Sequence, residues 1–270
     1  MKKNHFLLGL LFALPLLFTA CNKDRWLDGD TELTTSQDVL TAQDLIQDTE
    51  EEVDYELGTR DPEDLCPIVT VSPADGTYPR TVTIDYGTDG CEGWNGRIRK
   101  GIIQVTLTDT MIHEGAVRTV TFIGFSVDEV AIAGTKTLTN NGLNAEGQLT
   151  FTRVVSDASL TFPNGDVSEW EATQQITLIE GTGTPERIDD VIQLEGGSSG
   201  INRNGKPFTS EITVPLIKPF TCPWVVSGTR SVTVNDHTFT LDYGDGTCNK
   251  TALLTRPNGT TKTVLILRWW

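Results

Sequence analysis

The feature that most limits the possible folds of this chain is a two-residue alternation that recurs after residue 66. Threonine and other polar residues alternate there with valine, isoleucine, leucine and phenylalanine. A period of two places all the apolar side chains on one face of a β-strand, so each stretch predicts a strand with one buried face. The stretches are residues 81–86, 102–108, 118–127, 148–155, 172–179, 210–217, 237–243 and 263–269.

Six Asx-Gly pairs lie between these stretches and supply the positive φ that tight hairpins require. No helical pattern follows residue 65, so the crossover helices that parallel strands need are lacking. We therefore expect an all-β fold, an antiparallel meander of about 12 strands forming a sandwich or a strongly curved sheet, with a short N-terminal helix. Residues 196–200, Gly-Gly-Ser-Ser-Gly, have no lysine and no helix after them and predict a flexible loop. The six Asx-Gly pairs are Asp75-Gly76, Asn95-Gly96, Asn141-Gly142, Asn164-Gly165, Asn204-Gly205 and Asn258-Gly259.

The β region, residues 66–270, contains an internal repeat, residues 66–108 and 222–267. Each copy begins with Cys-Pro, continues through an alternating stretch that ends Asp-Tyr-Gly, and reaches a second cysteine four residues after that glycine. In the second copy a two-residue turn at Asn235-Asp236 pairs residues whose numbers sum to 471, which places Cys222 opposite Asn249 and beside Cys248. Four cysteines allow three connectivities. We expect Cys66–Cys91 and Cys222–Cys248, because each copy then closes its own hairpin in an oxidising compartment. Free or metal-bound thiols are the alternative, and the absence of C-x-x-C disfavours zinc.

The repeated turn admits two interpretations. In the first, the apolar residues of each copy point inward, and the aspartates and glycines turn the chain. In the second, paired carboxylates, Asp85 with Asp89 and Asp242 with Asp245, bind Ca²⁺. Two carboxylates per loop are few for a calcium site, so turn chemistry is the preferred interpretation and no cofactor is expected.

The first 20 residues have the pattern of a secretory signal peptide. Two lysines precede a 13-residue apolar segment, Phe6–Phe18, which is too short to span a bilayer. Phe18-Thr19-Ala20-Cys21 resembles a bacterial lipobox, with Phe18 where leucine is usual. The resemblance implies that Cys21 carries lipid and becomes the mature N-terminus. Several acyl chains together anchor a protein durably. Because Asn22 is not aspartate, the resemblance points to the outer membrane, with the protein facing the periplasm or the cell surface.

Residues 21–65 form an acidic segment. Fifteen acidic and three basic side chains lie in residues 22–65, which accounts for most of the net charge of −16. Such a block repels nucleic acid, and no basic patch is found elsewhere, so we expect no nucleic-acid partner. The segment is interpreted as a solvated tether. A helix is predicted over residues 36–57, where Val39, Ala42, Ile46, Thr49 and Val53 share one face. Because this apolar stripe is thin, we expect weak docking or partial disorder.

Together these features resemble the exported lipoproteins of Bacteroidota that have no assigned activity. The carriers are the lipobox, the acidic helix, residues 95–107 (NGRIRKGIIQVTL) and the closing segments Cys-Pro-Trp-Val-Val-Ser-Gly-Thr and Leu-Asp-Tyr-Gly-Asp-Gly-Thr-Cys. The resemblance implies no specific activity. Asp109-Thr110-Met111 also matches the short O-glycosylation motif of that group.

Signatures of catalysis are scarce. His113 and His237 have no partner placed by sequence, and no metalloprotease, nucleophile-elbow or phosphate-loop motif occurs. We expect a non-enzymatic lipoprotein, structural, adhesive or glycan-binding, whose partners are the membrane and carbohydrate or envelope proteins. Trp269 and Trp270 are the candidate sugar-stacking residues, because adjacent residues of a strand face opposite sides; Trp94, Trp170 and Trp224 are candidates with core packing as their alternative role. The second hypothesis is a lipid-anchored polysaccharide hydrolase with two carboxylates in a cleft.

Overall fold

The computed structural model describes residues 30–58, 65–93, 95–183 and 187–266. It contains one long α-helix, α1 (Thr31–Gly58), a 3₁₀ turn (Arg187–Asp189) and fourteen strands. The strands are β1 (Ile68–Ser72), β2 (Arg80–Asp85), β3 (Cys91–Glu92), β4 (Ile98–Leu107), β5 (Val117–Val127), β6 (Val130–Leu143), β7 (Leu149–Thr161), β8 (Val167–Glu180), β9 (Val191–Ile201), β10 (Pro207–Pro219), β11 (Ser227–Val234), β12 (His237–Asp245), β13 (Thr251–Thr255) and β14 (Thr261–Leu265).

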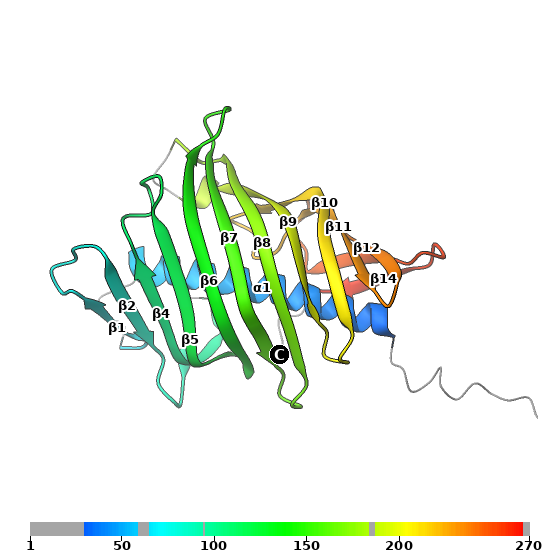
Figure 1. The fold of residues 1–270 in the computed structure, drawn as a ribbon, viewed down its shortest axis with the longest axis horizontal. Coiled ribbons are helices and arrows are strands. Elements are labelled where there is room, and N and C mark those ends of the chain that lie inside the picture. Colours follow the sequence, from blue (N-terminus) through cyan, green and yellow to red (C-terminus); the bar gives the residue numbers. More distant parts are fainter. Residues whose placement is uncertain (1–29, 59–64, 94, 184–186, 267–270) are drawn as a thin grey trace, which may run out of the picture.

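All the strands belong to one antiparallel sheet whose order follows the sequence, from β1 to β14, with β3 paired only to β4. The predicted meander is confirmed, and the sheet is open, since β1 and β14 each have one partner. Of the two expected architectures, the strongly curved sheet is the one formed: the strands pass in front of α1 in Figure 1 and bend around it. The strand count exceeds the expected 12 because short strands such as β3 and β13 carry too little alternation to be recognised.

Helix α1 is the centre of the core. The five residues of the predicted helical face, Val39 to Val53, are all buried, but so is every residue from Asp38 to Ile46, which covers the whole circumference of the helix. The interpretation of this segment as a solvated, weakly docked tether is therefore wrong for residues 31–58. The helix also begins five residues earlier than predicted, where the Asp30 carboxylate accepts a hydrogen bond from the Leu33 amide at 3.0 Å. None of the described helices is long and apolar enough to cross a membrane.

Bulges bend the long strands around α1. Register shifts interrupt the pairing of β6 with β7 at Gly134 and of β7 with β8 beside Asp157. Gly134 has φ 118°, and a Cβ there would lie 2.6 Å from the Ala158 Cα, so only glycine allows the two strands to approach this closely. Aligned bulges of this kind add twist and curvature to a sheet.

Two sequence-based expectations about glycine are wrong. Residues 196–200 are not a flexible loop but lie in the second half of β9, where residues 197–200 pair on both sides, with β8 and β10. The glycines of this run serve close packing, because a Cβ on Gly200 would lie 2.0 Å from the Glu169 carbonyl oxygen. Asn141-Gly142 is not a hairpin turn but a bulge near the end of β6. The other five Asx-Gly pairs lie in connections between strands, and Asn235-Asp236 forms the β11–β12 turn with φ of 49° and 62°.

The two copies of the repeat form hairpins near opposite ends of the sheet. Strands β1 and β2 pair in the first copy and β11 and β12 in the second, with Val234 opposite His237 as the predicted register requires. Both predicted disulfides are confirmed, Cys66–Cys91 with 6.3 Å and Cys222–Cys248 with 5.7 Å between Cα atoms. The residues predicted to point inward are buried at 2% exposure or less: Val82, Ile84, Tyr86, Phe239, Leu241 and Tyr243.

Candidate functional site

The inner face of the sheet is lined with basic side chains that meet the acidic residues of α1. The helix carries nine carboxylates and no basic residue. Seven basic residues of the sheet are buried, each at an inward position of a strand or next to a strand end, among apolar neighbours of the same parity. These residues are Arg97, Arg99, Arg118, Lys136, Arg153, Lys218 and Arg230. We call this set the inner basic face.

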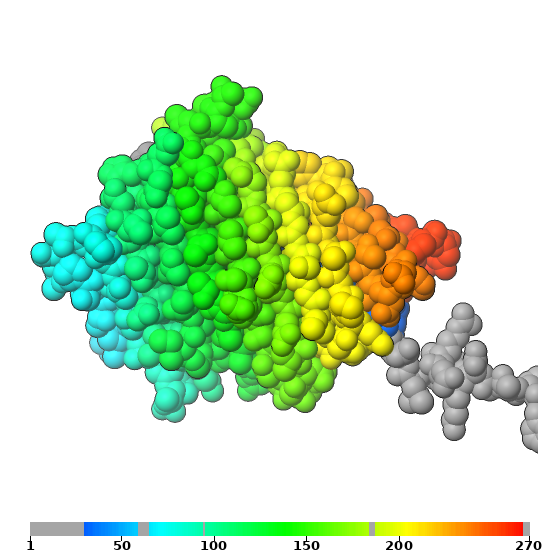
Figure 2. Space-filling model, in the orientation of Figure 1, coloured from blue at the N-terminus to red at the C-terminus, as the bar shows by residue number. Residues whose placement is uncertain are grey.

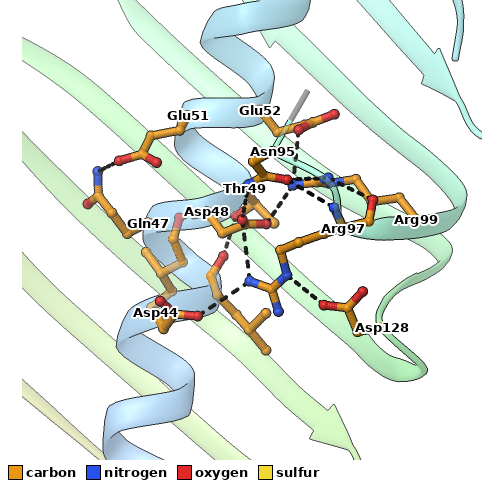
Figure 3. A network of polar contacts seen from close by, with 12 residues as sticks. Asp44, Gln47, Asp48, Thr49, Glu51, Glu52, Asn95, Arg97, Arg99 and Asp128 are labelled. Carbon is orange, nitrogen blue, oxygen red and sulfur yellow. Dashed lines mark hydrogen bonds and ion pairs between the residues drawn. The ribbon is translucent and has the colours of Figure 1, made fainter. Parts of the chain in front are cut away.

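The densest contacts join the middle of α1 to the start of β4. Figure 3 shows Asp44, Asp48 and Glu52 directed toward Arg97 and Arg99. Arg99 Nη2 lies 2.8 Å from Asp48 Oδ2 and 3.0 Å from Glu52 Oε2. Arg97 Nη1 lies 3.3 Å from both Asp44 Oδ2 and Asp48 Oδ1. Each of these three helix carboxylates therefore has a guanidinium group in contact.

A tyrosine of the repeat completes this cluster. The Tyr86 hydroxyl donates a hydrogen bond of 2.6 Å to Glu52 Oε1. Burial raises the pKa of Glu52, and the Arg99 guanidinium opposes that rise. Burial and the Glu52 carboxylate together raise the pKa of the Tyr86 hydroxyl far above its ordinary value, so the hydroxyl stays protonated and remains a donor.

Other faces of α1 and its N-terminal end are held in the same way. Glu50 contacts Arg118 and lies 2.8 Å from Lys136 Nζ, and Glu51 lies 2.6 Å from Lys218 Nζ. At the N-terminal end Glu32 lies 2.7 Å from Arg256 Nε. Pairs of this kind cost desolvation, so they specify the position of the helix more than they add to stability.

Two members of the inner basic face depart from this pattern. Arg153 donates through Nε and Nη2 to Gln174 Oε1, at 3.1 and 2.6 Å, and Arg230 Nη2 donates to Gln43 Oε1 at 3.0 Å. Gln174 Nε2 in turn donates to Gln43 Oε1 at 2.9 Å. These two arginines are therefore bound by amides and not by carboxylates.

The opposite face of the sheet, which α1 does not cover, is turned toward the viewer in Figure 2. Its strands present threonine, serine and glutamate side chains. Over β7 to β11, green to yellow in the figure, two hollows of about 640 and 660 Å³ share Glu171, Ser199 and Thr209. The floor of the hollows lies close to the backbone of β9, because that strand contributes only glycine and serine there: Gly196, Gly197, Ser198, Ser199 and Gly200. We call these joined hollows the outer groove.

The outer groove is lined by groups that hydrogen-bond to hydroxyls. The exposed carboxylates are those of Asp157 on β7, Glu169 and Glu171 on β8 and Glu211 on β10; no basic residue lines either hollow among the described residues. Strand pairing places Ser199 between Glu171 and Thr209, and Gly197 between Thr173 and Glu211. A polar, uncharged ligand with many hydroxyl groups suits this lining.

Several predicted site residues lie outside the described residues. These are the lipid-attachment residue Cys21, the stacking candidates Trp269 and Trp270, and Trp94. Trp170 is a core residue, 5% exposed, that lines cavities against α1, and Trp224 is half-buried.

The repeated aspartates cap their own turns. Asp85 Oδ1 accepts from the Gly87 amide at 2.8 Å, and Asp242 Oδ1 accepts from the Gly244 amide at 2.9 Å. Asp245 accepts from the Thr247 amide at 3.2 Å, and hydrogen bonding by Thr247 lowers its pKa. No group of three or more potential metal ligands was found among the described residues. The turn interpretation of these aspartates accounts for every contact they make.

The two histidines among the described residues each lie beside one acidic residue on the surface. His113 Nδ1 lies 3.0 Å from Asp109 Oδ2, and His237 Nδ1 lies 3.4 Å from Glu32 Oε1. Thr110, the residue that would carry the glycan in the predicted O-glycosylation motif, lies in the β4–β5 connection. Its hydroxyl donates a hydrogen bond of 3.0 Å to the Tyr78 hydroxyl. Neither histidine reaches the outer groove.

Sequence reasoning missed both the inner basic face and the outer groove. The signal for the first is a basic residue two positions from an inward apolar residue, as in Arg118 with Val120, Arg153 with Val155 and Arg230 with Val232. The signal for the second is a glycine–serine run between two alternating stretches. Comparisons of the chain with protein-family models, curated proteins and solved structures found no match.

Proposed function

We propose that this protein is an exported, lipid-anchored lipoprotein of the outer membrane that binds a glycan chain without transforming it. The observation that carries the binding role is the outer groove, with its glycine–serine floor and its rim of threonine hydroxyls and glutamates. Sugar hydroxyls both donate and accept hydrogen bonds, so they can pair with carboxylates and hydroxyls at once. Helix α1 occupies the inner face, which leaves the outer face as the accessible one.

The groove is tested by filling it. Ser199 is exposed on the floor, so Ser199→Tyr adds volume there without disturbing the backbone. Thr137→Tyr makes the same kind of change on β6, outside the groove, and is the matched control. The soluble chain with Cys21→Ser is applied to a glycan array. Binding that survives Thr137→Tyr and is lost in Ser199→Tyr supports the proposal; no binding, or equal binding by both variants, overturns it.

Analysis of a glycan that binds on the array distinguishes binding from hydrolysis. Glu171 and Glu211 lie on β8 and β10, on either side of β9, and are the two groove carboxylates that the hydrolase hypothesis would use. Mass spectrometry of a bound glycan after prolonged incubation shows whether it is shortened. An intact glycan supports a binding protein, and cleavage that Glu171→Gln abolishes would replace binding by hydrolysis as the function.

The anchor is tested separately. The lipobox resemblance at residues 18–21 predicts that Cys21 incorporates a fatty-acid label and that the protein sediments with outer membranes. Cys21→Ser should abolish both the labelling and the sedimentation. Labelling that persists in Cys21→Ser would contradict the proposed site of attachment.

A further inference from the structure

Buried arginines normally have carboxylate partners, and Arg153 and Arg230 do not. Arg153 is 0% and Arg230 3% exposed. The hydrogen bonds of both run to Gln43, Gln47 and Gln174, all of them neutral. Arginine does not lose its proton in proteins, and an uncompensated buried charge is costly. Burial and the charge of Arg230 lower the pKa of Arg153 to about 10, which leaves the Arg153 guanidinium charged at neutral pH.

A small cavity of about 10 Å³ adjoins Arg230 and Gln174, the residue to which Arg153 is hydrogen-bonded. It is lined by Gln43, Gln174, Ser198 and Arg230, together with Trp170 and apolar side chains of α1, β8 and β10. No carboxylate lines it. The acidic residues nearest along α1 are engaged elsewhere, Asp38 with Arg203 and Asp44 with Arg97. The cavity is at the lower limit of the size that one water molecule needs, so the lining side chains must move apart slightly to admit a larger monatomic ion.

Three N–H groups on residues that line this cavity have no partner: Gln43 Nε2, Trp170 Nε1 and Arg230 Nε. Gln43, Trp170 and Arg230 are 6%, 5% and 3% exposed, respectively. An N–H group only donates, whereas a water molecule also needs acceptors for its own hydrogens. Gln43 Oε1 already accepts two hydrogen bonds, from Gln174 and Arg230. Gln174 Oε1 accepts two hydrogen bonds from Arg153. Among the polar side chains of the lining only the Ser198 hydroxyl is left to accept, so donors outnumber acceptors and the surroundings favour a particle that accepts.

We propose that one halide-sized anion, chloride under ordinary conditions, binds in this cavity between Gln43, Trp170 and Arg230 and compensates the charge of the two arginines. It takes the place that helix carboxylates take at the other members of the inner basic face. The cavity lies on the α1 side of the sheet, and it shares Trp170, Ala172, Ser198 and Phe208 with the lining of the outer groove.

A salt series tests the anion. The full chain with Cys21→Ser is melted in sodium chloride and in sodium gluconate at equal ionic strength. Because an anion that binds only the folded state stabilises it, we expect a saturable rise of about 3–6 °C in chloride. Equal melting temperatures in the two salts would overturn the proposal.

Gln43→Glu supplies a carboxylate in place of the anion. The variant should melt higher than the parent in gluconate and should lose its response to chloride. Gln193→Glu, which adds the same charge on β9 away from α1, is the control and should keep that response. Retention of the full chloride response by Gln43→Glu would contradict the assignment.

Crystals of the parent chain grown in bromide keep the test decisive if Gln43→Glu does not fold. An anomalous peak beside Arg230 Nε and Gln43 Nε2 supports the site. An ordered water there, or an empty cavity, overturns it.

Discussion

At the scale of single residues, the internal repeat offers a matched comparison of two buried tyrosines. Tyr86 and Tyr243 occupy corresponding positions in the two copies, and each is 2% exposed. The Tyr86 hydroxyl donates to the Glu52 carboxylate, whereas the Tyr243 hydroxyl has no partner. Only one of two otherwise similar hydroxyl groups therefore makes a charge-assisted hydrogen bond.

Removing these hydroxyl groups should have unequal effects. A hydrogen bond to a charged group contributes about 1.5–3 kcal/mol, so we expect Tyr86→Phe to lower the free energy of unfolding by about that amount. Tyr243→Phe removes a buried polar atom that has no partner, and the change should be close to zero or stabilising. Denaturant unfolding of both variants measures the difference. Equal losses in the two copies would show that the Glu52 contact adds nothing.

The sequence predicts the positions of these tyrosines but not what they touch. Period-two alternation places Val82, Ile84 and Tyr86 on one face, and the structure confirms it. The same alternation also directs Arg99 and Arg118 inward, although arginine is ordinarily an outward residue. Only the acidic helix makes their burial tolerable, and no local pattern in the sequence links residue 52 to residue 99.

At the scale of elements, α1 behaves as part of the core. Leu45 is 2% exposed and packs within the core cluster that the strands complete. Leu45→Ala should lower the free energy of unfolding by about 2–5 kcal/mol, through lost burial and the cavity left behind. Leu143→Ala, at a residue 65% exposed near the end of β6, is the control and should change it little. A silent Leu45→Ala would restore the tether interpretation.

The buried carboxylates of α1 also set a pH dependence. Burial raises the pKa of Asp38 and of Glu52, with Arg203 and Arg99 opposing. A carboxyl group with a raised folded pKa binds its proton more tightly in the folded state. Its contribution to stability is present below the unfolded pKa of about 4 and is lost as the pH rises through the folded value.

We therefore expect the melting temperature to increase as the pH falls from about 7.5 to about 5.5, helped by the falling net negative charge. The double variant Asp38→Asn with Glu52→Gln lacks these two titrating groups and should show a shallower slope. A melting temperature that falls steadily over the same range would contradict the direction of both shifts.

The elements that sequence reasoning missed share a physical cause. Residues 196–200 have the composition of a loop because they are all glycine or serine. The glycines among them are nevertheless what lets β8, β9 and β10 approach closely. The helix looks marginal because its apolar stripe is thin, yet its carboxylates gain cationic partners from the sheet. In both cases a contact distant in sequence decides the local structure, and propensity alone does not show it.

At the scale of the whole molecule, the fold is an open sheet whose inner face is closed by one helix. Disulfide-linked hairpins lie toward the two ends of the sheet, β1–β2 and β11–β12. The sequence predicts both bridges because each copy of the repeat closes on itself. The copies lie far apart in the strand order, since six strands, β5 to β10, lie between residues 108 and 222. The bridges therefore act on separate parts of one cooperative structure.

Replacing each bridge tests this arrangement. The two loops span 25 and 26 residues, so the chain-entropy contribution should be nearly equal, about 3–4 kcal/mol each. Cys222 is 2% exposed, whereas Cys66 is half-buried, so Cys222→Ala with Cys248→Ala should cost more than Cys66→Ala with Cys91→Ala through lost packing. Because the bridges share no partner, the losses in the fourfold variant should add, as measured by denaturant unfolding. A fourfold loss well above the sum would show that α1, which contacts both hairpins through Glu52 and Gln43, transmits strain between the two ends.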